Sequence, residues 1–228
     1  MANHLDLEEQ EQLDQLKHFW NTWGTPISAL LVVVMGGLAA WNGYQYWQNR
    51  QAAQASALFD AVELAARSGD QERMKQAFAD LQGKYSGTMH ASQGGLIVAK
   101  GLQEAGQLDA AVSALTWVGE HAKDQGHQAV GKLRLAALLA DEKKLDEAFK
   151  ILSGSFPAEF AGVVADRKGD ILQLQGKAAE AAAEYSRAYK LLDENLEYRR
   201  LVEVKLNALG VDPASITAAT LQDSQGGK

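Results

Sequence analysis

A long stretch without charged side chains, residues 18–49, is the feature that most constrains this chain. Inside it, every residue of 27–41 except Ser28 is apolar or glycine. A helix over 26–47 would have 22 residues and, at about 1.5 Å per residue, could cross about 30 Å of hydrocarbon. Pro26 suits the first turn of such a helix, because the first amides of a helix have no acceptor within it. The sequence therefore predicts a membrane anchor over residues 26–47.

Aromatic residues gather at both ends of the apolar run. Trp20 and Trp23 precede it, and Trp41 and Trp47 follow it. Amphipathic rings favour the boundary between lipid and water, so this placement is typical of a membrane-spanning helix. The predicted anchor residues are Pro26, Ile27, Leu30, Leu31, Val32, Val33, Val34, Met35, Leu38, Trp41 and Trp47.

Two other interpretations of this run remain open. It could be a buried core helix, because its strictly apolar part spans only 15 residues. It could also be a signal peptide cleaved near Ala53-Gln54-Ala55, although the preceding residues are acidic where a signal peptide is basic. Lys17 precedes the run and Arg50 follows it, so the basic residues on the two sides are equal in number. Their count therefore decides poorly which way the helix crosses the membrane. Because the N-terminal tail is short, we expect it to stay in the cytoplasm.

The composition favours helices throughout and excludes several kinds of site. Hydrophobic residues make up 46% of the chain, aromatic residues only 7%, and there are 3 prolines in 228 residues. The absence of cysteine removes disulfides, thiolate nucleophiles and cysteine-bound metals. A net charge of −7 makes a nucleic-acid surface unexpected, because such a surface must be basic.

Small residues recur at a fixed spacing in the second part of the chain. Ala77, Ala111, Ala148 and Ala181 are separated by 34, 37 and 33 residues. Twelve residues before each of them lies another small residue: Ala65, Ala99, Ala136 and Gly169. Small residues on two helices joined by a tight turn allow close packing, and a period near 34 is that of the tetratricopeptide repeat. A plain alanine-rich bundle with coincidental similarity is the alternative.

We therefore predict an all-α chain with four helix pairs of this repeat type. Gly106-Gln107, Lys143-Lys144 and Gly176-Lys177 lie where the helices of a pair should meet. Residues 196–209 predict a further helix that covers the open end. The expected organisation is an acidic tail over 1–25, the anchor over 26–47, the repeat domain over 48–210 and a disordered tail over 211–228.

Three motifs together resemble one family. They are Glu9-Gln10 with Leu16-Lys17-His18-Phe19-Trp20, then Tyr44-Gln45-Tyr46-Trp47, and a stretch from Gly162 to Leu172 that contains Asp166-Arg167-Lys168-Gly169-Asp170. The combination is similar to the YfgM-like ancillary subunits of the bacterial Sec translocon. The resemblance implies a single-pass inner-membrane protein with a cytoplasmic tail and a periplasmic repeat domain. It also implies contact with the SecYEG channel, with a membrane-anchored periplasmic chaperone of the peptidyl-prolyl isomerase type, and with secreted polypeptides.

No group of residues predicts catalysis, a cofactor or a metal site. His121 and His127 are six residues apart and do not share a helix face. Gly94-Gly95 lacks the residues that complete a phosphate-binding loop. Acidic residues such as Asp109 and Glu180 stand at helix starts, where the helix dipole favours negative charge. The chain is therefore expected to act through contact and not as an enzyme.

In repeats of this kind the first helix of each pair lines a groove that binds partner segments. The resemblance places in it Phe59, Val62, Leu96, Lys100, Gln103, Val130, Leu133, Ala137, Val163, Asp166 and Asp170. These residues could instead fill the interior of a short superhelix. Two functions compete: an ancillary translocon subunit that scaffolds chaperone contact with emerging proteins, and a membrane-tethered regulator whose acidic tail sequesters a soluble signalling partner.

Overall fold

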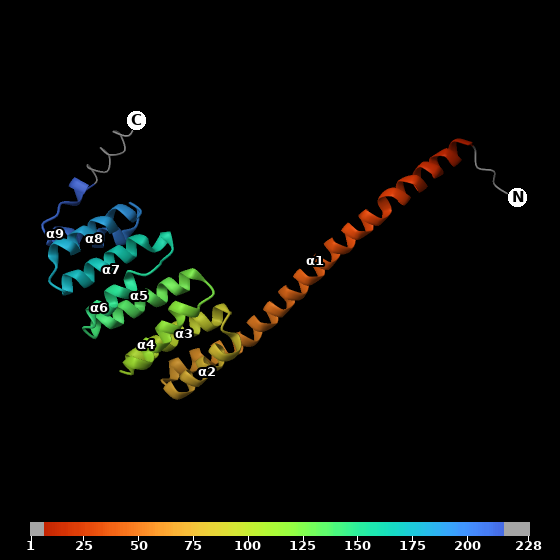
Figure 1. Cartoon of the computed structure of the whole chain (residues 1–228). Coiled ribbons are helices and arrows are strands. Elements are labelled where there is room, and N and C mark those ends of the chain that lie inside the picture. Colours follow the sequence, from red (N-terminus) through yellow and green to blue (C-terminus); the bar gives the residue numbers. More distant parts are fainter. Residues whose placement is uncertain (1–6, 217–228) are drawn as a thin grey trace. The chain divides into compact units, whose positions relative to one another are not determined.

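The computed structural model describes residues 7–216, and the regular structure of that range is helical, without strands. The first two helices are α1 (Leu7–Ser68) and α2 (Gln71–Tyr85), and the others follow in Figure 1. They are α3 (Met89–Glu104), α4 (Leu108–His121), α5 (Gln125–Asp141), α6 (Leu145–Leu152), a 3-10 turn η1 (Ala158–Phe160), α7 (Ala161–Leu174), α8 (Ala178–Leu191) and α9 (Glu197–Ala208). The predicted all-α class is confirmed.

Helix α1 is much longer than the predicted anchor, and Pro26 lies inside it. The prediction that a helix begins at Pro26 is therefore wrong. The residues before Pro26 are rich in Leu, Glu and Gln, which favour helix strongly enough to continue it in the N-terminal direction. After Trp47 the chain has no proline before Ser68, so nothing ends the helix there.

Within α1, the apolar run has no protein packed around it. Leu30, Val33 and Met35 are 65%, 71% and 66% exposed, and the flanking Trp41 is 61% exposed. Among the described residues, α1 is the one helix that has the length and composition to cross a membrane. These exposures do not fit the alternative of a buried core helix.

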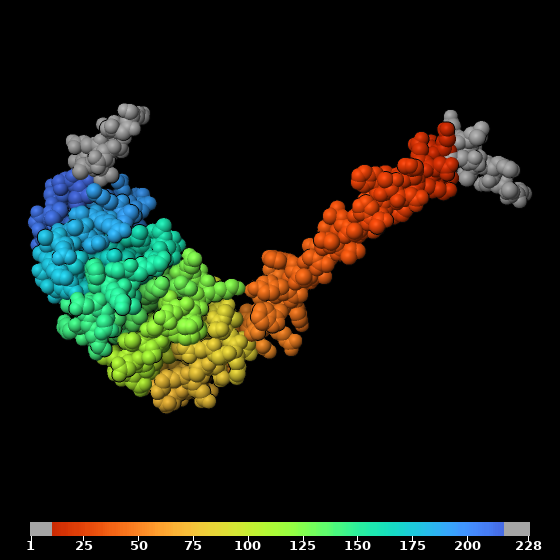
Figure 2. All heavy atoms as spheres, in the orientation of Figure 1, coloured from red at the N-terminus to blue at the C-terminus, as the bar shows by residue number. Residues whose placement is uncertain are grey.

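The chain divides into two compact units within α1, between Gln51 and Ala52. The second unit, here called the repeat unit, begins with the last turns of α1, which pair with α2. The pairs α3/α4, α5/α6 and α7/α8 follow in chain order, and α9 packs on α8. Figure 2 shows that neighbouring segments of the repeat unit lie in sequence order, from yellow through green to blue. Each pair therefore packs on the pairs that precede and follow it in the chain.

The small residues lie where the repeat pattern predicts close helix contacts. All eight are buried, from Ala65 and Ala77 in the first pair to Gly169 and Ala181 in the last. A Cβ atom on Gly169 would lie 2.5 Å from Cδ1 of Tyr185, so this position has room only for glycine. The tetratricopeptide-like register is thereby confirmed.

The turns within the pairs share one backbone conformation. Gly69, Gly106 and Gly176 have φ of 71°, 73° and 77°, and the equivalent residue of the third pair, Lys143, has φ of 62°. In each case the next amide donates to the carbonyl five residues earlier, as from Lys144 to Leu139 at 2.9 Å. This bond closes the end of the first helix and sets the direction of the second.

The ordered repeat unit extends beyond the predicted boundary at residue 210. Residues 213–216 form a helical turn, and Ile216 is buried in a cluster with Val202 and Leu206 of α9. These apolar contacts hold the chain there, so 211–216 is not the expected disordered tail. Residues 217–228 of that predicted tail lie outside the described residues, as do 1–6 of the predicted acidic tail.

Candidate functional site

Four residues of the predicted groove line one hollow between the first helices of successive pairs. Leu96, Lys100 and Gln103 come from α3, and Ala137 comes from α5. Ala99, Leu115, Arg134 and Leu138 complete the lining, and the cavity volume is about 350 Å³. We call this cavity the α3–α5 hollow.

The α3–α5 hollow combines an apolar floor with cationic side chains. Ala99, Leu115 and Leu138 are each 2% exposed and belong to the main hydrophobic core. Lys100 and Arg134 are exposed, and no carboxylate is part of the lining. The hollow can therefore take an apolar side chain and, beside it, a negatively charged group.

Other predicted groove residues lie elsewhere or are less accessible. Val62 is 0% exposed, so its prediction as a partner-binding residue is wrong. Val62 lies three residues before Ala65, and both face the core shared with α2. Phe59 is half-buried and meets the His90 ring edge to face at 5.6 Å. Half-buried positions are also found for Val130, Leu133 and Val163, and Leu133 packs against the core.

Side chains of α9 bind the two acidic residues that are predicted for the groove, Asp166 and Asp170. Asp166 is 0% exposed and accepts hydrogen bonds from Lys205 Nζ at 2.7 and 2.9 Å and from the Tyr198 hydroxyl at 2.5 Å. Asp170 accepts from Lys205 Nζ at 2.6 Å and from the Tyr185 hydroxyl at 2.8 Å. The prediction that Asp166 and Asp170 face a partner in the groove is therefore wrong, because both carboxylates are hydrogen-bonded within the chain.

The same contacts raise the pKa values of the Tyr185 and Tyr198 hydroxyl groups. Burial raises the pKa of Tyr185 well above its ordinary value of 10.0, and the hydrogen bond to Asp170 raises it further. The pKa of Tyr198 is raised for the same reasons, with Asp166 as its partner. Both hydroxyls therefore stay protonated as donors, and this cluster joins α7, α8 and α9 without offering a group for proton transfer.

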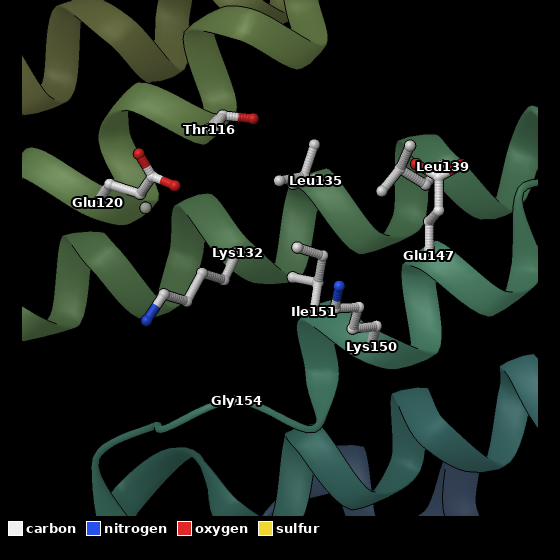
Figure 3. A pocket seen from close by; sticks show the side chains of 10 residues that line it. Thr116, Glu120, Lys132, Leu135, Leu139, Glu147, Lys150, Ile151 and Gly154 are labelled. Atoms are coloured by element: carbon white, nitrogen blue, oxygen red, sulfur yellow. The ribbon is translucent and has the colours of Figure 1, made fainter.

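A second hollow of about 410 Å³ lies between α4, α5 and α6 (Figure 3). Leu135 and Ile151 lie near its centre, and glutamate and lysine side chains stand on both sides of it. One wall of it is α6, which has only 8 residues, whereas α4 and α8 have 14 each. This α4–α6 hollow has charges of both signs at its edge: Glu120, Lys132, Glu147 and Lys150.

The histidines discussed above have local structural roles. His121 stacks on the Trp117 ring at 5.6 Å, and Nδ1 of His127 lies 2.9 Å from the carboxylate of Asp124. Asp124 also accepts from the amide of His127 at the start of α5, and this bond lowers the pKa of its carboxyl group. In the range that the structure describes, no three acidic or histidine side chains gather as metal ligands.

Sequence reasoning missed Arg134, which contributes half of the positive charge of the α3–α5 hollow. Helical periodicity could have found it, because Arg134 lies four residues after Val130 and three before Ala137 on the same face. It also missed the pairing of Lys205 with Asp166, which are 39 residues apart.

The comparisons with known proteins agree with this architecture. A family model described as a tetratricopeptide repeat-like domain matches residues 17–211. A Neisseria gonorrhoeae protein named ancillary SecYEG translocon subunit is 34% identical over 213 residues, which cover 92% of this chain and all of that protein. This chain belongs to the YfgM-like family.

Two further relatives have the same name, ancillary SecYEG translocon subunit. The Haemophilus influenzae protein is 27% identical, and the alignment covers 89% of this chain and 98% of that protein. The Escherichia coli protein is 26% identical, with 89% and 97% covered. The likeness to the family therefore includes both α1 and the repeat unit.

Proposed function

We propose that this protein is an ancillary subunit of the SecYEG translocon, held in the bacterial inner membrane by α1. The observation that carries the proposal is the match, over nearly the whole chain, to relatives named ancillary SecYEG translocon subunits. The exposed apolar run of α1 supports the anchor, because such a surface needs lipid around it.

The anchor is proposed to remain attached to the repeat unit. Helix α1 runs without a break through Ala53-Gln54-Ala55, the small-residue pattern of a possible cleavage site. Ala55 is 0% exposed and packs in the core of the repeat unit. Cleavage there would cut a packed helix, so the arrangement supports an uncleaved single-pass protein, with the N-terminus in the cytoplasm and the repeat unit in the periplasm.

The repeat unit is proposed to act as a scaffold. Its α3–α5 hollow holds a segment of a membrane-anchored periplasmic chaperone of the peptidyl-prolyl isomerase type, or of a secreted polypeptide that leaves the channel. Because the anchor keeps the repeat unit near the membrane, its local concentration at a channel exit is high, and weak contacts suffice.

Crosslinking in intact membranes tests this proposal. A photoreactive residue placed at Ala137, which is exposed in the hollow, is expected to capture SecYEG subunits, the chaperone or a translocating chain. The same residue at Gln173, exposed on α7 and outside the hollow, is the matched control. Equal capture from both positions, or none from Ala137, would contradict binding in the hollow.

The competing proposal, a regulator that sequesters a soluble partner through its acidic tail, makes a different prediction. Deleting residues 1–20 leaves the predicted span over residues 26–47 in place. A translocon subunit of the proposed kind should keep its crosslinks after this deletion. A tail-based regulator should lose its effect.

A further inference from the structure

The charges of the α3–α5 hollow indicate what kind of segment it holds. We propose that it recognises a carboxylate flanked by apolar side chains, within an extended or helical segment of another protein. This inference rests on the proposed function, because it specifies the chemistry of the partner at the same site.

The first argument is the sign of the charge. The whole chain has 29 acidic and 22 basic side chains and a net charge of −7. The lining of the hollow nevertheless includes Lys100 and Arg134 and no carboxylate. A local positive field on an acidic protein attracts anionic segments and repels cationic ones.

The second argument is that these two cations form weak ion pairs or none within the described part of the chain. None of the ion pairs in the described part of the chain involves Arg134. Lys100 has one partner, Glu104, at 3.7 Å, and the two side chains are 70% and 67% exposed. A pair this exposed contributes little, so an incoming carboxylate can compete for the ammonium group. The Arg134 guanidinium can in addition hold a carboxylate through two parallel hydrogen bonds.

The third argument is the floor of the hollow. Ala99, Leu115 and Leu138 are buried core residues whose surfaces line the cavity. A volume of about 350 Å³ has room for one or two side chains and not for a folded element. The partner segment therefore needs an apolar side chain next to its carboxylate.

The α4–α6 hollow provides a comparison within the same molecule. It is similarly apolar, but Lys132 and Lys150 at its edge are matched by Glu120 and Glu147. It has no net charge with which to select a partner, so it serves as the internal control.

The test uses the full-length protein in nanodiscs of zwitterionic phosphatidylcholine. Two short fluorescein-labelled peptides serve as probes, one of alternating Leu and Glu and one of alternating Leu and Gln. Fluorescence anisotropy is expected to show at least tenfold tighter binding of the Leu/Glu peptide at about 0.05 M salt, and a smaller difference at about 0.5 M. Empty nanodiscs correct for binding to lipid.

Variants assign the selectivity to the hollow. K100Q/R134Q is expected to abolish the preference for the Leu/Glu peptide. K150Q/K190Q changes the net charge by the same amount at two exposed lysines outside this hollow and is expected to keep the preference. Circular dichroism establishes that both variants remain folded.

The outcomes separate this inference from the proposed function. If both peptides bind equally and Ala137→Trp weakens both, the hollow binds segments but the charge selectivity is wrong. If K150Q/K190Q removes the preference as fully as K100Q/R134Q, the whole-protein charge is responsible and the inference is overturned. If neither peptide binds while Ala137 still crosslinks to the translocon, the inference fails and the proposed function stands.

Discussion

At the scale of single residues, Lys143 holds a backbone conformation that glycine holds at the equivalent turns. Its φ of 62° lies in the left-handed region, where the Cβ of an L-residue crowds the backbone. The crowding costs about 1–2 kcal/mol for residues other than glycine. Gly106 and Gly176 avoid it at the same place in their pairs.

Replacing Lys143 with glycine is expected to stabilise the repeat unit. The relief of crowding exceeds the extra chain entropy of glycine, so the free energy of unfolding should rise by about 0.5–1 kcal/mol. Urea titration of a fragment of residues 52–228 measures it. Gly176→Ala, the reverse change, should lower the same quantity by about 1 kcal/mol. A loss of stability in Lys143→Gly would assign the lysine side chain a role that the structure does not show.

Lys205 is the cation that allows Asp166 to be buried. Its ammonium group bonds both carboxylate oxygens of Asp166, which has no exposed surface. Lys205→Met should lower the free energy of unfolding by about 3–5 kcal/mol, because a buried carboxylate is left without a counter-charge. Urea titration measures the loss, and Lys190→Met, at an exposed site of α8, should stay within about 0.5 kcal/mol. Similar effects of the two changes would contradict the dependence of Asp166 on Lys205.

The raised pKa values of Tyr185 and Tyr198 predict a loss of stability in alkali. Because the pKa of Tyr198 is raised in the folded protein, its full contribution is present below about pH 10 and is lost as the pH rises above the unfolded value. The free energy of unfolding should therefore fall with increasing pH above about 10, and Tyr198→Phe should make that fall shallower. A slope unchanged by Tyr198→Phe would exclude this tyrosine as a cause.

At the scale of elements, the distance between paired helices is set by small residues. The ring of Tyr185 on α8 lies over Gly169 of α7, leaving no space for a methyl group. By contrast, an added Cβ at Gly83 of α2 meets no atom within 4 Å. Both glycines lie within helices, but Gly169 faces a neighbouring side chain at close range and Gly83 faces open space.

The same substitution should have opposite effects at these two sites. Gly169→Ala should lower the free energy of unfolding by about 1–3 kcal/mol, because it overpacks a close contact. Gly83→Ala should raise it by about 0.5–1 kcal/mol, because alanine favours the helix. Thermal and urea unfolding of the 52–228 fragment test both. Stabilisation by Gly169→Ala would remove the physical basis of the small-residue register.

Local periodicity explains which elements the sequence could predict. The spacing of Ala99 from Ala111 reflects contacts within one helix pair, so it was sufficient for the register and the turns. The burial of Asp166 depends on Lys205 in another element, and nothing in the local pattern encodes that pairing. The predicted start of α1 is wrong because a proline inside a helix disturbs only the turn before it. The helix-favouring residues that precede Pro26 extend over several turns and outweigh this local free-energy cost.

The candidate site was predictable to the extent that it follows one helix face. Leu96, Lys100 and Gln103 are spaced by four and three residues, and the structure places all three at the α3–α5 hollow. Val62 shares its position in the repeat with Leu96, three residues before a small residue, but it is fully buried. The register fixes the face of the helix, and the neighbouring elements decide how much of each side chain remains accessible.

At the scale of the whole molecule, one helix contributes to two different environments. The apolar run of α1 is exposed, whereas Ala55 and Val62 near its end are fully buried in the repeat unit. A membrane around the first part and a protein core around the second would satisfy both surfaces. The orientation of the chain across that membrane then decides which compartment contains the α3–α5 hollow.

The absence of cysteine makes this orientation directly measurable, because one introduced thiol is the unique labelling site. Gln12 lies before the apolar run and Gln173 lies in the repeat unit, and both are exposed. A membrane-impermeant maleimide added to spheroplasts should label Gln173→Cys and not Gln12→Cys, because the tail is proposed to be cytoplasmic. Detergent should make both thiols reactive, which controls for accessibility. Labelling of Gln12→Cys alone in intact spheroplasts would reverse the proposed topology and would move the hollow to the cytoplasmic side, away from secreted chains.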